Sequence, residues 1–577
     1  MKRTHYNGLL TINDVGQSVS LFGWVAKKRN LGSLLFIDLR DRTGIVQLLV
    51  KDPSSVPDIR NEYVIHVTGI VSKKDVPNPN LKTGSIEIIV SDLKVISSAQ
   101  TTPMIIDNQT DALEETRLKY RYLDIRRPIM QEKLIARSKI VKLFHEYLDD
   151  QGFIEVETPI LTLSTPGGAR DYLVPSRLQH GSFYALPQSP QIYKQLLMIG
   201  GMERYYQVAR CFRDEDLRAD RQPDFTQIDI EASFIEQDEF LSLMEPVLVK
   251  IWSQIVKEEI QLPLAKYTYE HVVTNYGSDR PDLRFDLPLV DVKPLLSKSS
   301  FEGFMDAKYI KGIILKNHGA SLSRKLIDEL NLELRKFGLK PAIVLKVSEG
   351  VLSGSFTKYL DEQLMKDIIS EYKLTENDAL VLTSGDEFKT FHFGMGALRN
   401  LLAKQFKLID EGKTSMFWVT EFPLFEKSDN GGLSSSHHPF TRPLAEDIPL
   451  LDSEPLKVRS AAYDIVINGY EAGGGSMRIY DKSLQQKIFE LLGMSEEDIK
   501  RKFGWFIEAF NYGTPPHGGI AFGLDRLTMI VTKTDNIRDV IAFPKNLSAI
   551  GPLEKTPAPV DESQLDELGI VIKKENK

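Results

Sequence analysis

The sequence predicts an α+β protein of several domains. Its 577 residues are too many for one hydrophobic core. The first 105 residues contain five short segments that alternate apolar and polar side chains, a pattern typical of strands. A hairpin with a long charged tip is predicted between residues 205 and 231, and helical periodicity reappears between residues 285 and 408.

Residues 1–105 are predicted to form a small β-barrel. The alternating segments are Val19–Ala26, Leu34–Leu39, Ile45–Val50, Tyr63–Val71 and Ile86–Val90. Five short strands with charged turns fit an OB-fold. The apolar series of these strands leave Phe36, Gln47 and Glu87 on the opposite face, and Arg29 ends a basic run just before them. This combination is typical of a surface on which nucleic-acid bases stack, although Phe36 is also suited to a domain interface.

The hairpin gathers polar groups of both signs. Its return strand alternates so that Gln227, Asp229 and Glu231 share one face, and the isoleucines between them share the other. Arg213 ends the outgoing strand. Such groups are costly on a sheet face unless they meet a polar ligand, so the hairpin predicts a ligand site, with a surface hairpin of ion pairs as the alternative.

Three segments resemble the motifs of class II aminoacyl-tRNA synthetases. The hairpin resembles motif 2, a strand–loop–strand with arginines, a glutamate and a phenylalanine at fixed positions. Gly518–Arg526 resembles motif 3, in which a glycine-rich strand delivers an arginine to the γ-phosphate of a nucleotide. A helix predicted at Lys133–Leu148, followed by Gly152–Pro159, resembles motif 1, which forms the dimer interface in this class. The resemblance implies an antiparallel-sheet catalytic domain and a homodimer.

Three further segments resemble the aspartate-specific members of the class, and the match extends over nearly the whole chain to the bacterial type of aspartyl-tRNA synthetase. They are Gln188–Lys194, Phe225–Asp229 and Gly469–Arg478. A pocket for aspartate needs two cations for two carboxylates and an anion for the ammonium. The predicted aspartate-binding residues are Ser189, Gln191, Lys194, Arg213, Gln227, Asp229, His437 and Arg478.

The resemblance also implies an ATP site, in which Arg213 and Arg526 are the predicted catalytic residues. The predicted ATP-binding residues are Arg213, Asp214, Glu215, Arg221, Gln222, Phe225, Glu471, Gly523, Leu524, Asp525 and Arg526. Asp464 and Glu471 supply hard oxygen ligands, which suit a Mg²⁺ ion that bridges phosphates. In the barrel, Arg29, Phe36, Gln47 and Glu87 are the predicted anticodon-binding residues.

The resemblance therefore implies ATP-dependent attachment of L-aspartate to tRNA-Asp through aspartyl-adenylate. Whether tRNA-Asn is also charged stays open. Lysyl and asparaginyl relatives fit two pocket cations less well, and a non-catalytic RNA-binding relative is disfavoured because all three phosphate-binding arginines are present. One departure concerns Thr165–Asp171, where Gly167 stands in place of a glutamate of the family's mobile loop.

The predicted domain order is an anticodon-binding domain at 1–105, a hinge at 106–135, catalytic parts at 136–284 and 409–577, and an inserted α+β domain at 285–408. A C-terminal extension is expected to pack on the catalytic domain. The net charge of −8 disfavours a generic basic surface for nucleic acid, so RNA contacts are expected to be local. The single cysteine, Cys211, excludes an internal disulfide, and no apolar run reaches about 18 residues. We therefore expect a soluble cytoplasmic protein without a membrane partner.

Overall fold

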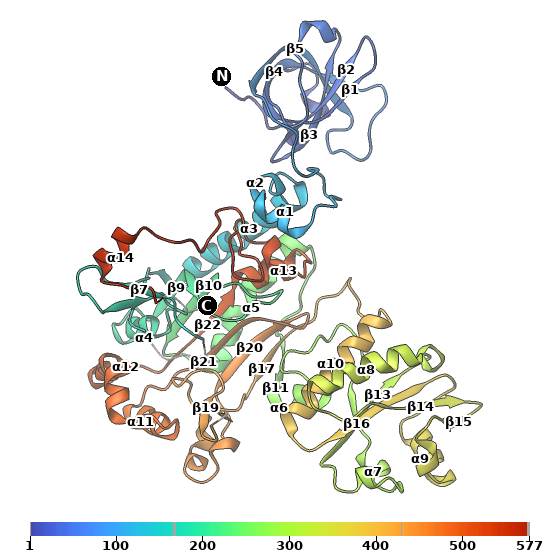
Figure 1. Ribbon diagram of the computed structural model, residues 1–577, viewed down its shortest axis with the longest axis vertical. Coiled ribbons are helices and arrows are strands. Elements are labelled where there is room, and N and C mark those ends of the chain that lie inside the picture. Colours follow the sequence, from blue (N-terminus) through green and yellow to red (C-terminus); the bar gives the residue numbers. More distant parts are fainter. Residues whose placement is uncertain (1, 165–168, 429, 574–577) are drawn as a thin grey trace. The chain divides into compact units, whose positions relative to one another are not determined.

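The computed structural model describes residues 2–164, 169–428 and 430–573, which form two compact units (Figure 1). The first unit comprises Met1–Lys139, Asp216–Pro223 and Thr534–Lys577. The second comprises Ile140–Glu215 and Asp224–Lys533. Within the described ranges, no helix has the length and apolarity that a membrane crossing requires.

A closed five-stranded barrel opens the first unit and confirms the predicted OB-fold. Its strands are β1 (Ser18–Asn30), β2 (Leu35–Asp41), β3 (Gly44–Val50), β4 (Val64–Lys73) and β5 (Ile86–Ser97), in the order β1-β2-β3-β5-β4. The apolar series point inward as expected, and Leu35, Ile37 and Leu39 of β2 are buried in the barrel core. Phe36 between them is partly exposed on the outer face.

The hinge contains two short helices, where the sequence predicts one. They are α1 (Glu114–Lys119) and α2 (Arg121–Asp124), separated by Tyr120, whose backbone is not helical. The helix that follows, α3 (Pro128–Asp150), begins five residues before its predicted start at Lys133. Pro128 suits that first position because proline has no N–H to satisfy and its φ is already helical.

The hinge packs against the C-terminal segment of the same unit. The guanidinium of Arg121 is buried and donates to the backbone oxygens of Arg538, Ile541 and Ala542, at 2.5–2.9 Å. The last helix is α14 (Glu562–Leu568). The expectation that the C-terminal extension packs on the catalytic domain is therefore not met, because residues from Thr534 onward group with the hinge and barrel.

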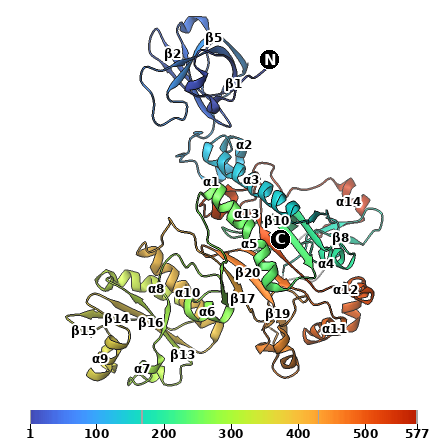
Figure 2. The ribbon, with the colours of Figure 1, turned by 180° about the vertical axis from the view of Figure 1, so that it is seen from behind.

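An eight-stranded sheet forms the centre of the second unit, with the order β11-β17-β20-β21-β22-β10-β9-β6 (Figures 1 and 2). The strands are β6 (Ile154–Glu155), β9 (Arg204–Phe212), β10 (Asp224–Ser233), β11 (Ala265–Thr268), β17 (Met416–Thr420), β20 (Ala462–Ile467), β21 (Tyr470–Met477) and β22 (His517–Gly523). The predicted antiparallel sheet is confirmed, with parallel pairing only at its two edges, β11–β17 and β6–β9, among the described residues.

One face of this sheet is covered by helices. Ile228 and Ile230 of β10 belong to a buried cluster with residues of α3, α5 (Gln237–Ile251) and α13 (Leu524–Val531). The opposite face, which carries the alternate residues of β10, is therefore available for polar groups. Two small hairpins flank it: β7 (Leu173–Pro175) with β8 (Phe183–Ala185), and β18 (Phe425–Lys427) with β19 (Leu433–Ser435). The helices α4 (Gln191–Ile199), α6 (Tyr269–Tyr276), α11 (Lys482–Leu491) and α12 (Glu496–Ala509) complete this part.

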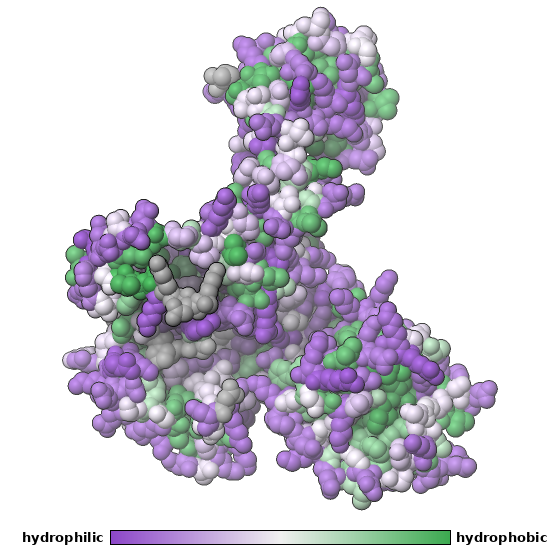
Figure 3. All heavy atoms as spheres, viewed as in Figure 1, coloured by the Kyte–Doolittle hydropathy of each residue, from purple (hydrophilic) through white to green (hydrophobic). Residues whose placement is uncertain are grey.

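A second sheet of five strands lies within the region predicted as an insertion. Its order is β12-β13-β16-β14-β15, from β12 (Leu289–Asp291), β13 (Tyr309–Leu315), β14 (Ile343–Ser348), β15 (Val351–Ser353) and β16 (Ala379–Gly385). Helices α8 (Arg324–Lys336) and α10 (Phe388–Gln405) contribute to one apolar cluster of this region, and α7 (Lys293–Leu296) and α9 (Glu362–Glu371) to another. On the surface seen in Figure 3, hydrophilic residues predominate, with small apolar areas between them.

Candidate active site

The β9–β10 hairpin places the predicted polar residues where the alternation indicates. Asp229 and Glu231 are fully buried on the face away from the isoleucine cluster, and β10 pairs with β9 on one side and β22 on the other. Neighbouring strands thus cover both edges of β10. This location excludes water from the two carboxylates, so they need partners within the protein.

The partners are two buried cations. Lys194 of α4 lies 2.8 Å from Asp229 Oδ1 and 3.2 Å from Glu231 Oε2. Arg478, just after β21, donates from Nε and Nη2 to the two oxygens of Glu231, at 2.9 and 3.1 Å. We call Lys194, Asp229, Glu231 and Arg478 the buried charge cluster. All four side chains are at most 2% exposed, and their formal charges sum to zero.

The two carboxylates of the cluster differ in their electrostatic surroundings. Burial opposes ionisation of Glu231, but Arg478 and Lys194 outweigh it and lower its pKa to about 2. For Asp229 burial dominates over the attraction of Lys194, and the pKa is raised. Asp229 Oδ2 is buried and has no hydrogen-bond partner among the described residues. An orphaned anionic oxygen of this kind is suited to a ligand donor such as an ammonium group.

Glu231 and His438 are site residues that the sequence prediction did not include. Arg478 Nη1 donates to His438 Nε2 at 2.7 Å and to Ser476 Oγ at 2.6 Å. Burial and the nearby Arg478 hold the pKa of His438 well below its usual value, so its imidazole is neutral. The predicted residue of this histidine pair, His437, is exposed and packs edge-on against the ring of Phe422. The signal for Glu231 was its place on the polar face, two residues after Asp229.

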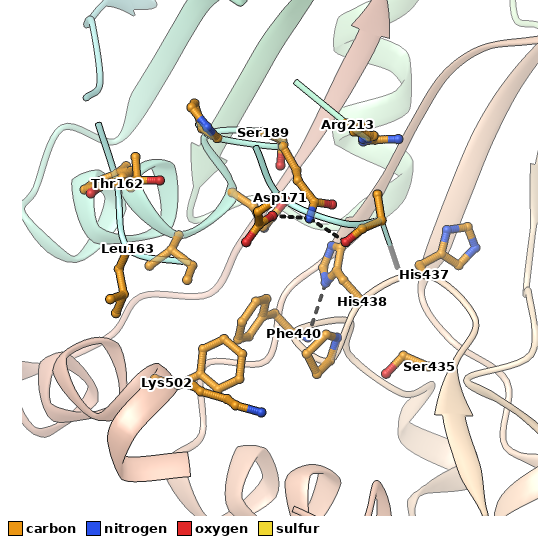
Figure 4. Close-up of a pocket in the computed structure, with 18 of the residues that line it drawn as sticks. Thr162, Leu163, Asp171, Ser189, Arg213, Ser435, His437, His438, Phe440 and Lys502 are labelled. Atoms are coloured by element: carbon orange, nitrogen blue, oxygen red, sulfur yellow. Dashed lines mark hydrogen bonds between the residues drawn. The ribbon is translucent and has the colours of Figure 1, made fainter. Parts of the chain in front are cut away.

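A cavity of about 690 Å³ opens beside the cluster. Five predicted residues line it: Ser189, Gln191, Arg213, Glu215 and His437 (Figure 4). Gln191 Nε2 is a buried donor without a partner among the described residues. The members of the buried charge cluster are not among the described lining residues, but His438 is, and its hydrogen bond to Arg478 connects the cavity to the cluster.

The predicted nucleotide residues lie on the hairpin and at the β22–α13 junction. The guanidinium of Arg213 lies 5.1 Å from the ring centre of Phe225, in a cation–π arrangement. Asp525 accepts a hydrogen bond from the backbone N–H of Thr226 at 2.9 Å, which ties α13 to the hairpin. Arg526, in the first turn of α13, donates to the backbone oxygen of Glu471 at 2.7 Å. Gly523 precedes Leu524 as the N-cap of this helix. Asp214, at the end of the hairpin, pairs with Arg170 in an isolated bridge.

Arg221 and Gln222 belong to the first unit, within Asp216–Pro223. The side-chain amide of Gln222 pairs with the backbone of Lys545, accepting from its N–H at 2.8 Å and donating to its oxygen at 3.0 Å. Gln222 is therefore engaged by the C-terminal segment. Gly167 of the predicted mobile loop lies outside the described residues.

Asp464 and Glu471 are brought together across a glycine. A Cβ atom on residue 474 would lie 2.7 Å from Asp464 Oδ1 and 3.2 Å from Glu471 Oε1, so Gly474 leaves room for both carboxylates. Asp464 Oδ1 is buried without a hydrogen-bond partner in the described part of the chain. Burial and the charge of Glu471 raise its pKa well above the usual value. Two crowded carboxylates with an unsatisfied oxygen fit a divalent cation, and Mg²⁺ commonly takes one or two protein carboxylates together with phosphates.

The four predicted anticodon residues share one outer face of the barrel. Arg29 pairs with Phe36 in the β1–β2 register. Gln47 Nε2 donates to Glu87 Oε2 at 3.1 Å, and Lys74 Nζ donates to Gln47 Oε1 at the same distance. Lys74, which the sequence prediction did not include, adds a cation to this face.

Comparisons with known proteins agree with the fold. Residues 113–547 match the family described as tRNA synthetases class II (D, K and N), and residues 19–96 match the OB-fold nucleic acid binding domain. Among solved structures, asparaginyl-tRNA synthetase from Pyrococcus horikoshii complexed with asparaginyl-adenylate has a TM-score of 0.60 at 20% identity, covering 97% of this chain and 99% of that one. Aspartyl tRNA synthetase from Entamoeba histolytica has a TM-score of 0.56 at 19% identity, covering 93% and 90%. At such identities these two likenesses show the fold alone.

Curated relatives are much closer in sequence. The aspartate–tRNA(Asp/Asn) ligase of Geobacillus sp. (strain WCH70) is 49% identical over 588 residues, which cover 100% of this chain and 99% of the relative. The protein of the same name from Bacillus cereus (strain B4264) is 48% identical over 582 residues, with 99% and 98% covered. The family match, the barrel and the eight-stranded sheet therefore lead to one conclusion: the chain belongs to the class II tRNA synthetases of the D, K and N family.

Proposed function

We propose that the chain is an aspartate–tRNA ligase that activates L-aspartate with ATP and transfers it to tRNA. In the first step the α-carboxylate of aspartate attacks the α-phosphorus of ATP, an O–P bond forms and pyrophosphate leaves. In the second step the 3′-hydroxyl of the terminal adenosine attacks the aspartyl carbonyl carbon, an ester forms and AMP leaves. Positioning and charge neutralisation are sufficient for both steps, so no enzyme nucleophile is needed.

The buried charge cluster is the observation that carries this proposal. Lys194 and Arg478 supply two cations for the side-chain carboxylate of the substrate, and Asp229 Oδ2 supplies an acceptor for its ammonium group. Glu231 holds both cations in place before the substrate arrives. A lysine side chain would add a third cation beside these two, and the neutral amide of asparagine would gain less from them. The names of the curated relatives support the same amino acid.

The remaining predicted residues are assigned to the nucleotide. Arg213 neutralises charge at the α-phosphate, Glu215 and Phe225 hold the adenine, and Arg526 binds the γ-phosphate with Arg221. The cation–π contact of Arg213 with Phe225 and the Asp525–Thr226 hydrogen bond support this assignment, because they fix the hairpin and α13 in one arrangement. Ser189, Gln191, Gln227 and His437 complete the aspartate site in this proposal.

Asp464 and Glu471 are proposed to hold Mg²⁺ when ATP binds. The bound ion would offset negative charge on the phosphates. Before that, the two carboxylates repel each other, and the unsatisfied Asp464 Oδ1 stays available for the cation.

The range of tRNA substrates is a second question that the relatives bear on. Both curated relatives carry names that specify tRNA(Asp/Asn). We therefore infer that this chain charges tRNA-Asn with aspartate in addition to tRNA-Asp, with Arg29, Phe36, Gln47 and Glu87 contacting the anticodon. Charging assays with the two purified tRNAs decide between one substrate and two.

We also propose that the enzyme is a homodimer that acts in the cytoplasm, where ATP and tRNA are available. The motif 1 strand β6 forms an edge of the eight-stranded sheet. Apolar side chains near it are about half exposed, between 47% and 56%: Ile154, Ile160, Leu161, Leu173 and Phe183. An open sheet edge beside exposed apolar side chains supports a self-complementary interface.

Pyrophosphate exchange tests the proposed amino acid. The purified chain is incubated with ATP, Mg²⁺ and labelled pyrophosphate, and with aspartate, asparagine or lysine in turn. The proposal expects label to enter ATP with aspartate and not with the other two. Exchange that depends on asparagine or lysine instead would reject it.

A further inference from the structure

The 690 Å³ cavity extends beyond the residues assigned to aspartate. At one end lie Arg213 and His437, and at the other Lys502, with Phe440 between them in the view of Figure 4. Tyr193, Phe503 and Trp505 also line it. We call the part formed by Tyr193, Phe440, Lys502, Phe503 and Trp505 the aromatic annex.

Helix α12 builds this annex through its amphipathic pattern. Its apolar face buries Ile499, Phe503 and Phe506 in a cluster with Phe440. Lys502 and Trp505 adjoin that face, and both line the cavity. Trp505 is 38% exposed, which is unusual for the largest apolar side chain when no ligand covers it.

The size of the cavity exceeds what aspartate requires. Pockets of about 300–1,000 Å³ enclose ligands of drug size, and aspartate is much smaller than these. The adenine of ATP is assigned to the hairpin through Glu215 and Phe225, away from α12. The annex therefore has no occupant in the proposed first step of the reaction.

The chemistry of the annex suits an unpaired nucleotide. Trp505 and Tyr193 present rings whose centres are 5.8 Å apart with planes at 45°, so a flat base can stack on one and contact the other. Lys502 supplies a cation, and the distance from its Nζ to Asp498 Oδ1 is 3.9 Å, which leaves its charge available for phosphate. With a net charge of −8 on the chain, contacts to RNA have to be local ones such as this.

We propose that the aromatic annex binds the unpaired 3′-terminal nucleotides of tRNA, with a base stacked on Trp505 and a backbone phosphate beside Lys502. This inference rests on the proposed function, because the transfer step brings the terminal ribose to the aspartyl carbonyl in the same cavity. The annex then holds the end of the tRNA while Arg213 and Gln191, which line the cavity, hold the aspartyl group.

Two variants and two matched controls on nearby residues test the annex. Trp505→Ala and Lys502→Gln are expected to lower kcat/KM for tRNA by about tenfold to a hundredfold, the range that loss of one stacked base produces. Lys500→Gln, an exposed lysine on the same helix, and Tyr512→Ala, an aromatic residue that is 75% exposed outside the cavity, should leave it unchanged. Trp505→Phe keeps a ring and should retain most of the charging rate.

The aspartate-dependent pyrophosphate exchange of the same variants separates this inference from the proposed function. If the wild-type chain shows no such exchange, the proposed function fails. If exchange is normal in every variant and charging falls only in the annex variants, the annex inference is supported. Normal charging by Trp505→Ala and Lys502→Gln, or an equal loss of exchange and charging, would overturn the annex alone.

Competition with shortened tRNA examines the ligand directly. A tRNA-Asp transcript that lacks its terminal adenosine is compared with the full transcript as an inhibitor of charging. We expect the full transcript to bind more tightly to the wild-type chain and the two to bind equally to Trp505→Ala. An unchanged difference in the variant would show that the terminal nucleotide binds elsewhere.

Discussion

Glu231 determines how the two buried cations of the site are held. Its carboxylate accepts two hydrogen bonds from Arg478 and lies 3.2 Å from Lys194. A buried pair of this kind adds little net stability over an apolar replacement, but removal of one partner leaves an uncompensated charge. The gain is preorganisation, because Arg478 and Lys194 already occupy the positions in which a substrate carboxylate meets them.

Arg478→Leu is therefore expected to affect both substrate binding and stability. It removes one cation from the aspartate site and leaves Glu231 buried with Lys194 as its remaining cation, at a cost of about 3–5 kcal/mol. Aspartate-dependent exchange should fall below detection, while ATP binding, measured by calorimetry, persists. Arg459→Leu is the control, because Arg459 pairs with surface acids and is 41% exposed. Normal exchange in Arg478→Leu would exclude Arg478 from the aspartate site.

Asp464→Asn tests the proposed Mg²⁺ site. The variant removes one anionic ligand, so the Mg²⁺ concentration for half-maximal exchange should rise by at least the ~10-fold that loss of an indirect metal contact costs. The metal-free protein should be as stable as the wild type or more so, because the buried charge beside Glu471 is gone. Asp452→Asn, at an exposed acid that pairs with Lys487, is the control. An unchanged Mg²⁺ requirement would place the metal elsewhere.

At the scale of residues, the sequence predicted positions better than partners. Alternation along β10 was enough to place Asp229 and Glu231 on the polar face. It did not predict that Glu231 binds Arg478, 247 residues later, because this pairing depends on the order of strands in the sheet. The choice between His437 and His438 likewise depended on which ring turns toward Arg478.

Among the elements, the barrel offers the clearest separation of RNA binding from chemistry. Phe36→Ala should lower kcat/KM for tRNA charging by about tenfold, within the range for one stacked base, and leave pyrophosphate exchange unchanged. Ile70→Ala, at a residue of β4 that is 49% exposed, is the matched control. An equal loss in both assays would mean that Phe36 supports the fold instead of the anticodon.

The five-stranded sheet region contains a pH-dependent stabilising residue, Asp378. Burial opposes its ionisation, but hydrogen bonds from Lys316 and from the backbone N–H groups of Thr375 and Asn317 lower its pKa to about 2. Because this value lies below that of an unfolded aspartate, the ionised group stabilises the region at neutral pH. This contribution, about 2 kcal/mol, is lost as the pH falls from about 4 to about 2.

Asp378→Asn should accordingly lower the melting temperature at pH 7, and the difference from the wild type should shrink at pH 3. Thermal unfolding followed at both pH values measures this. Asp306→Asn, at an exposed aspartate of the same region, should have no effect at either pH. A difference that stays constant with pH would show that ionisation of Asp378 does not stabilise the fold.

The strands of the barrel and the β9–β10 hairpin were predictable because alternation is a local signal. The start of α3 was predicted five residues late, since Pro128 was not used as a start signal. The break at Tyr120 left no such signal. It depends on Arg121, which turns toward backbone oxygens more than 400 residues away in the sequence.

For the whole molecule, the proposed dimer has a simple test. Light scattering at micromolar concentration should give twice the mass of the 65.4 kDa chain. Leu161→Asp, which places a charge among the exposed apolar side chains near β6, should shift the population toward monomer. Ile448→Asp, at an exposed isoleucine far from β6 in the sequence, is the control. A monomeric wild type would remove the interface assigned to motif 1.

The order of domains followed from where the motifs fall in the sequence, but the grouping of the C-terminal segment did not. Residues after Thr534 are polar and carry few periodic signals. Their place beside the hinge is set by contacts such as those of Arg117 and Lys133 with Asp539. Pairings between the two ends of a long chain leave no trace in local composition.

The central claim is that this chain esterifies tRNA with aspartate. The most direct measurement is to incubate the purified chain with ATP, Mg²⁺, tRNA-Asp and an equimolar mixture of amino acids, and to identify the terminal adenosine ester by mass spectrometry after nuclease digestion. The buried charge cluster predicts aspartyl-adenosine as the product. Recovery of an asparaginyl or lysyl ester, or of no ester while a known synthetase charges the same tRNA, would contradict the account.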